Sequence, residues 1–275
     1  MNDIRIGACD WALPGAGLHA VRIAAEFGLE ALSLKIGLYE NNYPIAEQTM
    51  QRYYLEDQQK YGIAYCAVAL NDFDNIPMHA RDGTANYQKA WTILKKGVST
   101  AVALGVPLIQ VPGFCASEIK SEGDLGASVK AFQYLCDEAG THGIHIAAEN
   151  LMTPEEFKLL YEMVGRENFG VYYDTQNYHL FRGYDQLTIL EGLYPYMTEQ
   201  IHVKDGRGAI SGALLGTGDS GFDGSMELLK EKQFKGYFLL ENYYDQLPLR
   251  LENDDPYELL KQDIDILKQK IRAFS

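Results

Sequence analysis

Short apolar runs, four to eight residues long, alternate along the chain with longer segments whose apolar positions recur at helical spacing. β-Branched and aromatic residues are common in the short runs, which therefore predict strands. The predicted strands are 4–9, 31–35, 63–70, 106–111, 144–149, 169–174, 201–204 and 237–241. The predicted helices are about 19–27, 45–60, 84–104, 125–141, one that opens at 153–156, and then 184–193, 225–231 and 256–274.

Eight strand–helix units divide the 275 residues into steps of about 34 residues, the size typical of a (β/α)8 barrel, an α/β fold. In the last helix, Leu260, Ile264, Leu267 and Ile271 recur on one face, which we expect to pack on the barrel. No linker or low-complexity tract divides the chain, so we expect a single TIM-barrel domain over residues 1–275. The alternative is an open, doubly wound sheet. It is weakened because the first strand leads into GACDW and not into a G-x-G-x-x-G motif.

The charge balance makes some partners unfavourable. Lys and Arg number 24 and Asp and Glu number 38, which gives a formal net charge of −14. Nucleic acid or an anionic membrane would require a basic face, so we expect neither as a partner. The opening residues, MNDIR, show no signal-peptide pattern, and no apolar run reaches the ~18 residues of a spanning helix. The four cysteines are far apart and form no C-x-x-C pair, as is typical of reduced thiols, so we expect a cytoplasmic protein.

Four predicted strands end in or contain a residue that can bind a metal. Glu149, Asp174 and Glu241 each close an apolar run, and His202 lies within one. Their spacings of 25, 28 and 39 residues are each about one barrel unit. Because the active site of such a barrel lies at the C-terminal ends of its strands, we expect these side chains to lie next to one another. The alternative is that the acids only pair with Arg or Lys at the rim, and that His202 is a core histidine.

Three carboxylates and one imidazole are mostly hard oxygen donors. They suit Mn²⁺ or Mg²⁺, with Co²⁺ or Zn²⁺ also possible, and they leave coordination positions for a chelating substrate. A structural zinc site would instead favour thiolates in a closed tetrahedron. The pattern therefore predicts one divalent metal bound by Glu149, Asp174, His202 and Glu241.

The motifs AAEN, YYDT, IHVKD and LLEN carry these four residues, and a Gly-x-Gly-Asp turn lies between the last two motifs at 216–219. Through them the chain resembles the sugar isomerase/epimerase superfamily built on a xylose isomerase-like TIM barrel. That superfamily includes ketose 3-epimerases, hydroxypyruvate isomerase, inosose dehydratase and endonuclease IV. The resemblance implies that the four residues bind one divalent metal. It also implies that Glu149 and Glu241 act as acid–base groups on opposite faces of a sugar.

The chemistry of such a site agrees with this implication. A metal that chelates a carbonyl and the neighbouring hydroxyl stabilises an enediolate, while one glutamate removes the α-proton and a group across the substrate returns it. We therefore expect a metal-dependent sugar or sugar-phosphate isomerase or epimerase with a small carbohydrate substrate, and the sequence leaves a homo-oligomer open. The alternatives are an inosose-type dehydratase, a lyase that expels a β-hydroxyl after the same first step, and a non-catalytic carbohydrate-binding protein.

Five further residues are candidates for substrate binding. Lys204 faces the same way as His202 and can contact a substrate oxygen or phosphate, or else form a salt bridge to Asp174 or Glu241. Trp11 can form an apolar wall for a sugar or simply pack. The resemblance suggests substrate roles for Arg207 and for Glu155, although Glu155 equally suits a helix start.

The fifth candidate, Asn177, departs from the family pattern. Ketose 3-epimerases carry a histidine at this position, three residues after the aspartate ligand, so a close ketohexose epimerase is disfavoured. Endonuclease IV fits worse still, because it needs several more histidines for three zinc ions. The loop from Gly206 to Gly224 contains seven glycines, and we expect it to shape the substrate pocket and to be partly mobile without ligand.

Overall fold

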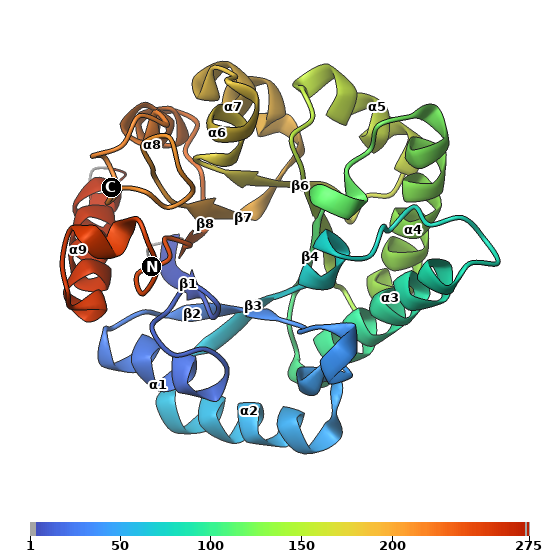
Figure 1. Ribbon diagram of the computed structural model, residues 1–275, viewed down its shortest axis with the longest axis horizontal. Helices are drawn as coiled ribbons and strands as arrows, with labels where there is room; N and C mark the ends of the chain where they lie inside the picture. The colour runs from blue at the N-terminus through green and yellow to red at the C-terminus, as the bar shows by residue number, and fades with distance from the viewer. Residues whose placement is uncertain (1–3, 273, 275) are drawn as a thin grey trace. The chain divides into compact units, whose positions relative to one another are not determined.

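The computed structural model describes residues 4–272 and 274. In that part of the chain eight parallel strands close into a barrel in the order β1 to β8, with helices around it (Figure 1). The strands are β1 (Ile4–Cys9), β2 (Ala31–Lys35), β3 (Ala64–Ala69), β4 (Leu108–Pro112), β5 (His145–Glu149), β6 (Phe169–Asp174), β7 (Met197–Val203) and β8 (Gly236–Leu240). The predicted (β/α)8 barrel is thereby confirmed. The opening residues 1–3, used above in the signal-peptide argument, and residue 273 of the last predicted helix lie outside the described residues.

The α-helices follow the alternating pattern of the sequence. They are α1 (Leu18–Glu26), α2 (Gln48–Tyr61), α3 (Ala85–Leu104), α4 (Glu122–Gly140), α5 (Pro154–Val164), α6 (Asn177–Arg182), α7 (Gln186–Leu193), α8 (Phe222–Glu231) and α9 (Pro256–Arg272). Among the described helices, none is both long enough and apolar enough to cross a membrane.

Contacts group the chain into two compact units. The first comprises 1–33, 57–64 and 173–275, and the second comprises 34–56 and 65–172. The single domain over residues 1–275 stays a prediction, and each unit is described by itself below.

In the first unit, β1, β8 and β7 lie side by side, with Ala8 opposite Leu240 and Leu240 opposite Val203. These three strands therefore end at one level, and the residues that follow them lie at the same edge. The N–H of Thr175, just after β6, donates to the carbonyl of His202 over 3.2 Å and so ties the end of β6 to β7.

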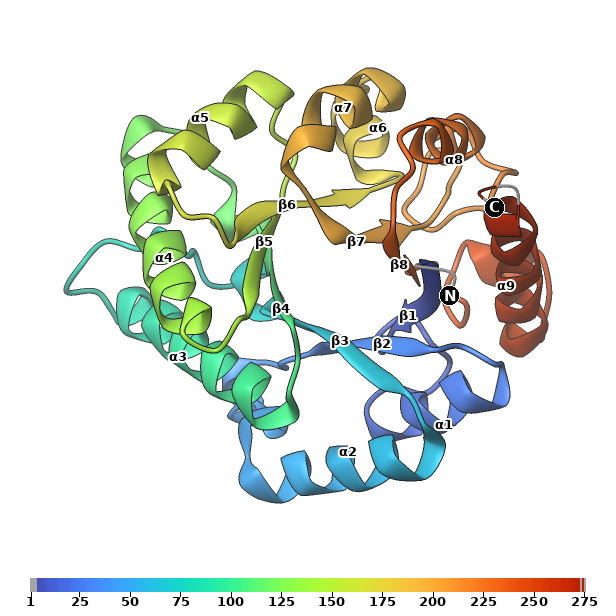
Figure 2. The same ribbon diagram turned by 180° about the vertical axis from the view of Figure 1, so that it is seen from behind.

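The second unit holds β3, β4, β5 and most of β6. β4 and β5 lie side by side in Figure 2. Pro112 of β4 lies opposite Glu149 of β5, and Ala148 lies opposite Val171 of β6. Glu149 thus ends β5 one position beyond the last residue that pairs with β6.

Two helices show features that the sequence indicates, namely the start of α5 and the apolar face of α9. The helix predicted to open at 153–156 is α5: Thr153 caps it in a capping box with Glu156, and Pro154 takes the first helical position. The apolar face of α9 is buried, and α9 lies beside β1 in Figure 1. That packing confirms the predicted role of this face.

The boundaries differ from the prediction in a few places. β7 begins at Met197, four residues early, because partly exposed polar residues at its start hide the strand pattern. The short helix α6 was not predicted. It begins at Asn177, three residues after Asp174, whose side chain accepts the N–H groups of Gln176 and Asn177. β8 ends at Leu240, so Glu241 is the first residue after the strand rather than its last.

Candidate metal centre

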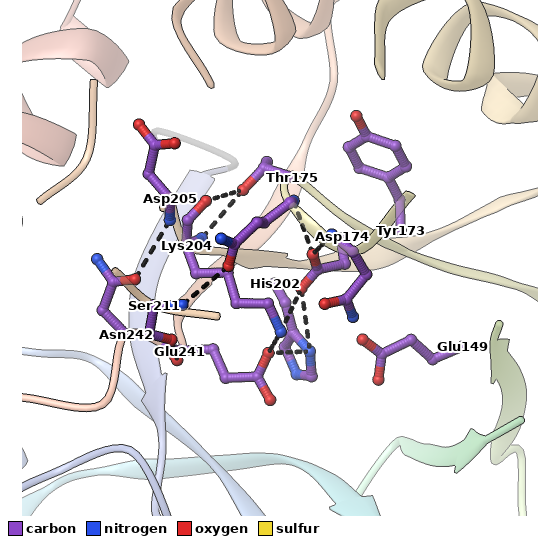
Figure 3. A network of polar contacts seen from close by, with 12 residues as sticks. Glu149, Tyr173, Asp174, Thr175, His202, Lys204, Asp205, Ser211, Glu241 and Asn242 are labelled. Atoms are coloured by element: carbon purple, nitrogen blue, oxygen red, sulfur yellow. Dashed lines mark hydrogen bonds and ion pairs between the residues drawn. The ribbon is translucent and has the colours of Figure 1, made fainter. Parts of the chain in front are cut away.

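Three of the predicted metal-binding residues meet in the first unit. Asp174 ends β6, His202 lies near the end of β7, and Glu241 follows β8. All three are buried, and one ligand atom from each lies within 4.8 Å of the others. Figure 3 shows them around a common centre.

The backbone of the following turn fixes the Asp174 carboxylate. Its Oδ1 accepts the N–H groups of Gln176 and Asn177, each over 2.7 Å. Its Oδ2 lies 3.1 Å from Nζ of Lys204 and 4.0 Å from Nδ1 of His202. One oxygen of Asp174 is thus used to orient the side chain, and the other lies toward the centre.

Both oxygens of Glu241 are engaged. Oε1 accepts the indole N–H of Trp11 over 3.0 Å. Oε2 accepts a hydrogen bond from Nζ of Lys204 over 2.6 Å and lies 3.1 Å from Nδ1 of His202. Burial raises the pKa of Glu241, but the neighbouring His202 and Lys204 outweigh it and hold that pKa far below its usual value. The carboxylate is therefore ionised, as a metal ligand or a base must be.

The imidazole of His202 is held in place as well as buried. The ring of Trp11 meets it edge-on, with the ring centroids 5.9 Å apart and an angle of 78° between the planes. One indole therefore orients both Glu241, through its N–H, and His202, through its ring. Trp11 was predicted as an apolar wall or as packing, and neither interpretation included the hydrogen bond to a carboxylate.

This donor set fits a divalent cation. Two carboxylates and an imidazole are ligand types shared by Mn²⁺, Mg²⁺, Co²⁺ and Zn²⁺. Asp174 and Glu241 bring two carboxylates into a buried site, and Lys204 supplies one ammonium group beside them. A cation would offset the charge that burial makes costly.

Cys9 belongs to the same surroundings, although sequence reasoning treated it only as a scattered thiol. It ends β1, is fully buried, and forms with His202 and Glu241 a second group of side chains that could hold an ion. The signal was its position, because it ends a predicted strand just as the acids do. A thiolate donor would favour a softer metal such as zinc.

Glu149 lies in the second unit, where it ends β5 and is buried. It accepts a hydrogen bond from Nε2 of Gln110 in β4. Sequence reasoning missed Gln110. Its signal was a single polar residue within the apolar run VPLIQVP.

The other predicted site residues differ in their surroundings. Lys204 is buried and forms the salt bridges to Asp174 and Glu241 that were its alternative interpretation. Asn177 is buried at the start of α6. Glu155 is exposed in the first turn of α5, as expected for a helix start. Arg207 is exposed, and its guanidinium donates to the carbonyl of Thr217.

The glycine-rich loop between β7 and α8 is built around Asp205. Its Oδ2 accepts the N–H groups of Gly216 and Gly218 over 2.9 and 3.0 Å. Its Oδ1 accepts the N–H of Gly206 and the hydroxyl of Ser220. Sequence reasoning missed this role, because residue type alone did not indicate that one carboxylate would hold four points of the loop.

A buried polar group of α9 holds the same loop from another side. Oδ1 of Asp263 accepts the N–H of Leu215 over 2.8 Å, and Oδ2 accepts hydrogen bonds from Asn242 and Tyr244. Burial raises the pKa of Asp263 to about 7, although these three hydrogen bonds act in the opposite direction. Asn242 also accepts the N–H of Asp205, so the two aspartates belong to one network.

Known proteins resemble the chain over nearly its whole length. The 2-epi-5-epi-valiolone 7-phosphate 2-epimerase of Actinoplanes sp. is 27% identical over 253 residues, which cover 91% of this chain and 92% of that protein. D-Allulose 3-epimerase from Methylomonas sp., solved in complex with D-allulose, has a TM-score of 0.77 and 18% identity and covers 98% of each chain. The IOLI protein, solved with a zinc atom, has a TM-score of 0.74 and 17% identity and covers 98% of this chain and 99% of its own.

At these identities the two solved structures establish a shared fold only. The family described as Xylose isomerase-like TIM barrel matches residues 21–270, which is most of the sequence. The chain therefore belongs to the xylose isomerase-like TIM barrel family.

Proposed function

We propose that this protein is a metal-dependent sugar or sugar-phosphate isomerase or epimerase that transfers protons at a carbon next to a carbonyl. The observation that carries the proposal is the buried group of Asp174, His202 and Glu241 at the ends of neighbouring strands. The epimerase relative and the epimerase structure support an enzyme of the isomerase class.

The proposed ligands are these three residues and Glu149, the fourth candidate for the same ion. Glu149 is a buried carboxylate that ends β5, and β5 pairs with β6, which ends in Asp174. Mn²⁺ or Mg²⁺ suits an oxygen-rich set, and the zinc atom of the IOLI protein keeps zinc a candidate, as cobalt is. A bound divalent cation would polarise a carbonyl and its neighbouring hydroxyl and stabilise negative charge on their oxygens.

The protein's own groups would move the protons. The two oxygens of Glu241 are fixed by Trp11 and Lys204, so the carboxylate would accept a proton without first changing its orientation. Glu149, oriented by Gln110, is the proposed partner that returns or removes the proton on the other face of the substrate.

The remaining predicted residues would bind the substrate. Trp11 and Asn177 border the centre through Glu241 and Asp174. Arg207 is an exposed residue of the glycine-rich loop, and its guanidinium suits a phosphate group. The relative whose name gives a 7-phosphate supports a phosphorylated substrate. Glu155 keeps a substrate role as a prediction only. A cytoplasmic location and a homo-oligomer likewise stay predictions.

Incubation with candidate substrates in D₂O tests the proposal. The probes are ketoses, their phosphates and inososes, each with Mn²⁺. We expect deuterium at the carbon next to the carbonyl of one substrate, together with an epimer or isomer as product. Asp174→Asn is the matched control, because it keeps the shape of the side chain and removes one ligand charge. Loss of water from the product would instead support the dehydratase alternative, and no exchange with any probe would refute the proposal.

A further inference from the structure

Lys204 is a buried ammonium group among the proposed metal ligands. It is 2% exposed and follows β7 two residues after His202, so the two side chains lie on the same face of the chain. An isolated buried ammonium would be very costly, and Asp174 and Glu241 offset that cost by direct contact. A lysine at this position is therefore part of the charge balance of the site.

The ammonium contacts the carboxylate oxygens that a metal would need. Oδ1 of Asp174 and Oε1 of Glu241 are already bound by other donors, namely backbone N–H groups and the indole of Trp11. The two remaining oxygens are Oδ2 of Asp174 and Oε2 of Glu241, and both lie within 3.1 Å of Nζ of Lys204. His202 Nδ1 is 3.1 Å from the same Oε2, so the imidazole and the ammonium converge on one atom (Figure 3).

We propose that Lys204 is the internal counter-ion of the metal-free site and that it competes with a divalent cation for Asp174 and Glu241. Two cations that share the same carboxylate oxygens repel each other strongly in a buried site. Metal binding must therefore weaken the contacts of Lys204. The lysine lowers the affinity for the ion and keeps the two carboxylates paired when no ion is bound.

The charges give the direction of each effect. Whatever the charge of His202, removal of the Lys204 ammonium leaves the two carboxylates with one more uncompensated negative charge. Removing the lysine charge should therefore tighten the binding of a cation and destabilise the metal-free protein. These opposite effects distinguish a competitor from a residue that simply supports the fold, because loss of a supporting residue would lower both the metal affinity and the stability of the metal-free protein.

The test rests on the proposed metal site and compares four proteins by calorimetric titration with Mn²⁺ and by thermal unfolding. They are wild type, Lys204→Met, Lys204→Arg and Lys261→Met. The last is the matched control, because it removes the same charge from an exposed lysine that pairs with Asp265. If Lys204→Met does not fold without metal, Lys204→Gln replaces it, since the amide keeps a hydrogen-bond donor but carries no charge.

We expect Lys204→Met to bind Mn²⁺ at least ~10-fold more tightly than wild type, with a lower melting temperature in the metal-free form and a larger rise on adding Mn²⁺. Lys204→Arg, which keeps the charge, and Lys261→Met should not bind more tightly. Wild-type binding that His202→Ala abolishes, together with unchanged or weaker binding by Lys204→Met, would overturn the competition but leave the proposed function standing. No Mn²⁺ binding by either wild type or Lys204→Met would overturn both.

Discussion

Replacing Trp11 by Phe removes the N–H that donates to Oε1 of Glu241 over 3.0 Å while keeping an aromatic ring near His202. Glu241 is only 6% exposed, so water cannot readily take the place of the lost donor. A hydrogen bond to a charged group contributes about 1.5–3 kcal/mol to stability. For a chain of this size, that loss should lower the melting temperature by about 3–12 °C.

The same substitution should also weaken metal binding. A partner that orients a ligand through a hydrogen bond typically changes metal affinity by about 10–100-fold when it is removed. We therefore expect the Mn²⁺ dissociation constant of Trp11→Phe to rise by that factor, measured by calorimetry on metal-free protein.

Trp91→Phe is the matched control. The chain has two tryptophans, both half-buried, and Trp91 packs on Tyr134 in the second unit with ring centroids 4.7 Å apart. This control removes the same atoms without touching Glu241, so its Mn²⁺ affinity should equal that of wild type. Equal affinity in Trp11→Phe and Trp91→Phe would refute the orienting role of Trp11.

Three further predictions follow from the site and the loop. Glu149→Gln and Glu241→Gln should fold but lose about 10²–10⁴-fold in turnover. If the two glutamates are separate bases, one variant should keep exchange of the substrate proton with D₂O while the other loses it. Full turnover in both metal-loaded variants would leave Glu149 and Glu241 as metal ligands only. Asp263, with its pKa raised from 3.8 to about 7, holds a proton in the folded state that the unfolded chain releases between those values. The free energy of unfolding should therefore fall as pH rises through that window, by up to about 4 kcal/mol from this group. Urea unfolding should then show that the stability of Asp263→Asn relative to wild type is higher at pH 8 than at pH 5. The same difference in the free energy of unfolding at both pH values would contradict this assignment. Asp205→Asn should speed amide hydrogen exchange across 206–220, measured by mass spectrometry, and unchanged exchange would count against its anchoring role.

The strand pattern and the residue types at strand ends were readable from the sequence. Most strands contain a contiguous apolar run, so their existence depends on neighbours in the chain, and β6 matches its predicted bounds at both ends. The proposed ligands could be named for the same reason, because barrel geometry brings strand ends together whatever the residues between them.

The contacts that orient those ligands could not be predicted. Trp11 is 230 residues away from Glu241, and nothing near either residue indicates the hydrogen bond between them. From its position in the sequence, Lys204 could contact either a substrate oxygen or an acidic side chain. Only the packed structure shows that its ammonium contacts the carboxylates of Asp174 and Glu241. Asp205 was missed because its partners are mostly backbone N–H groups, which every residue other than proline carries.

The way Asp205 holds its loop has a consequence for changing substrate preference by mutation. Most of its bonds go to main-chain amides, so they do not depend on which side chains the loop displays. Gly218 is a fixed point, because a Cβ there would come within 2.2 Å of the Asp205 carboxylate. A library that randomises exposed positions such as Arg207, and leaves Asp205 and Gly218 untouched, therefore varies the exposed side chains of the loop while the bonds that hold its backbone are kept.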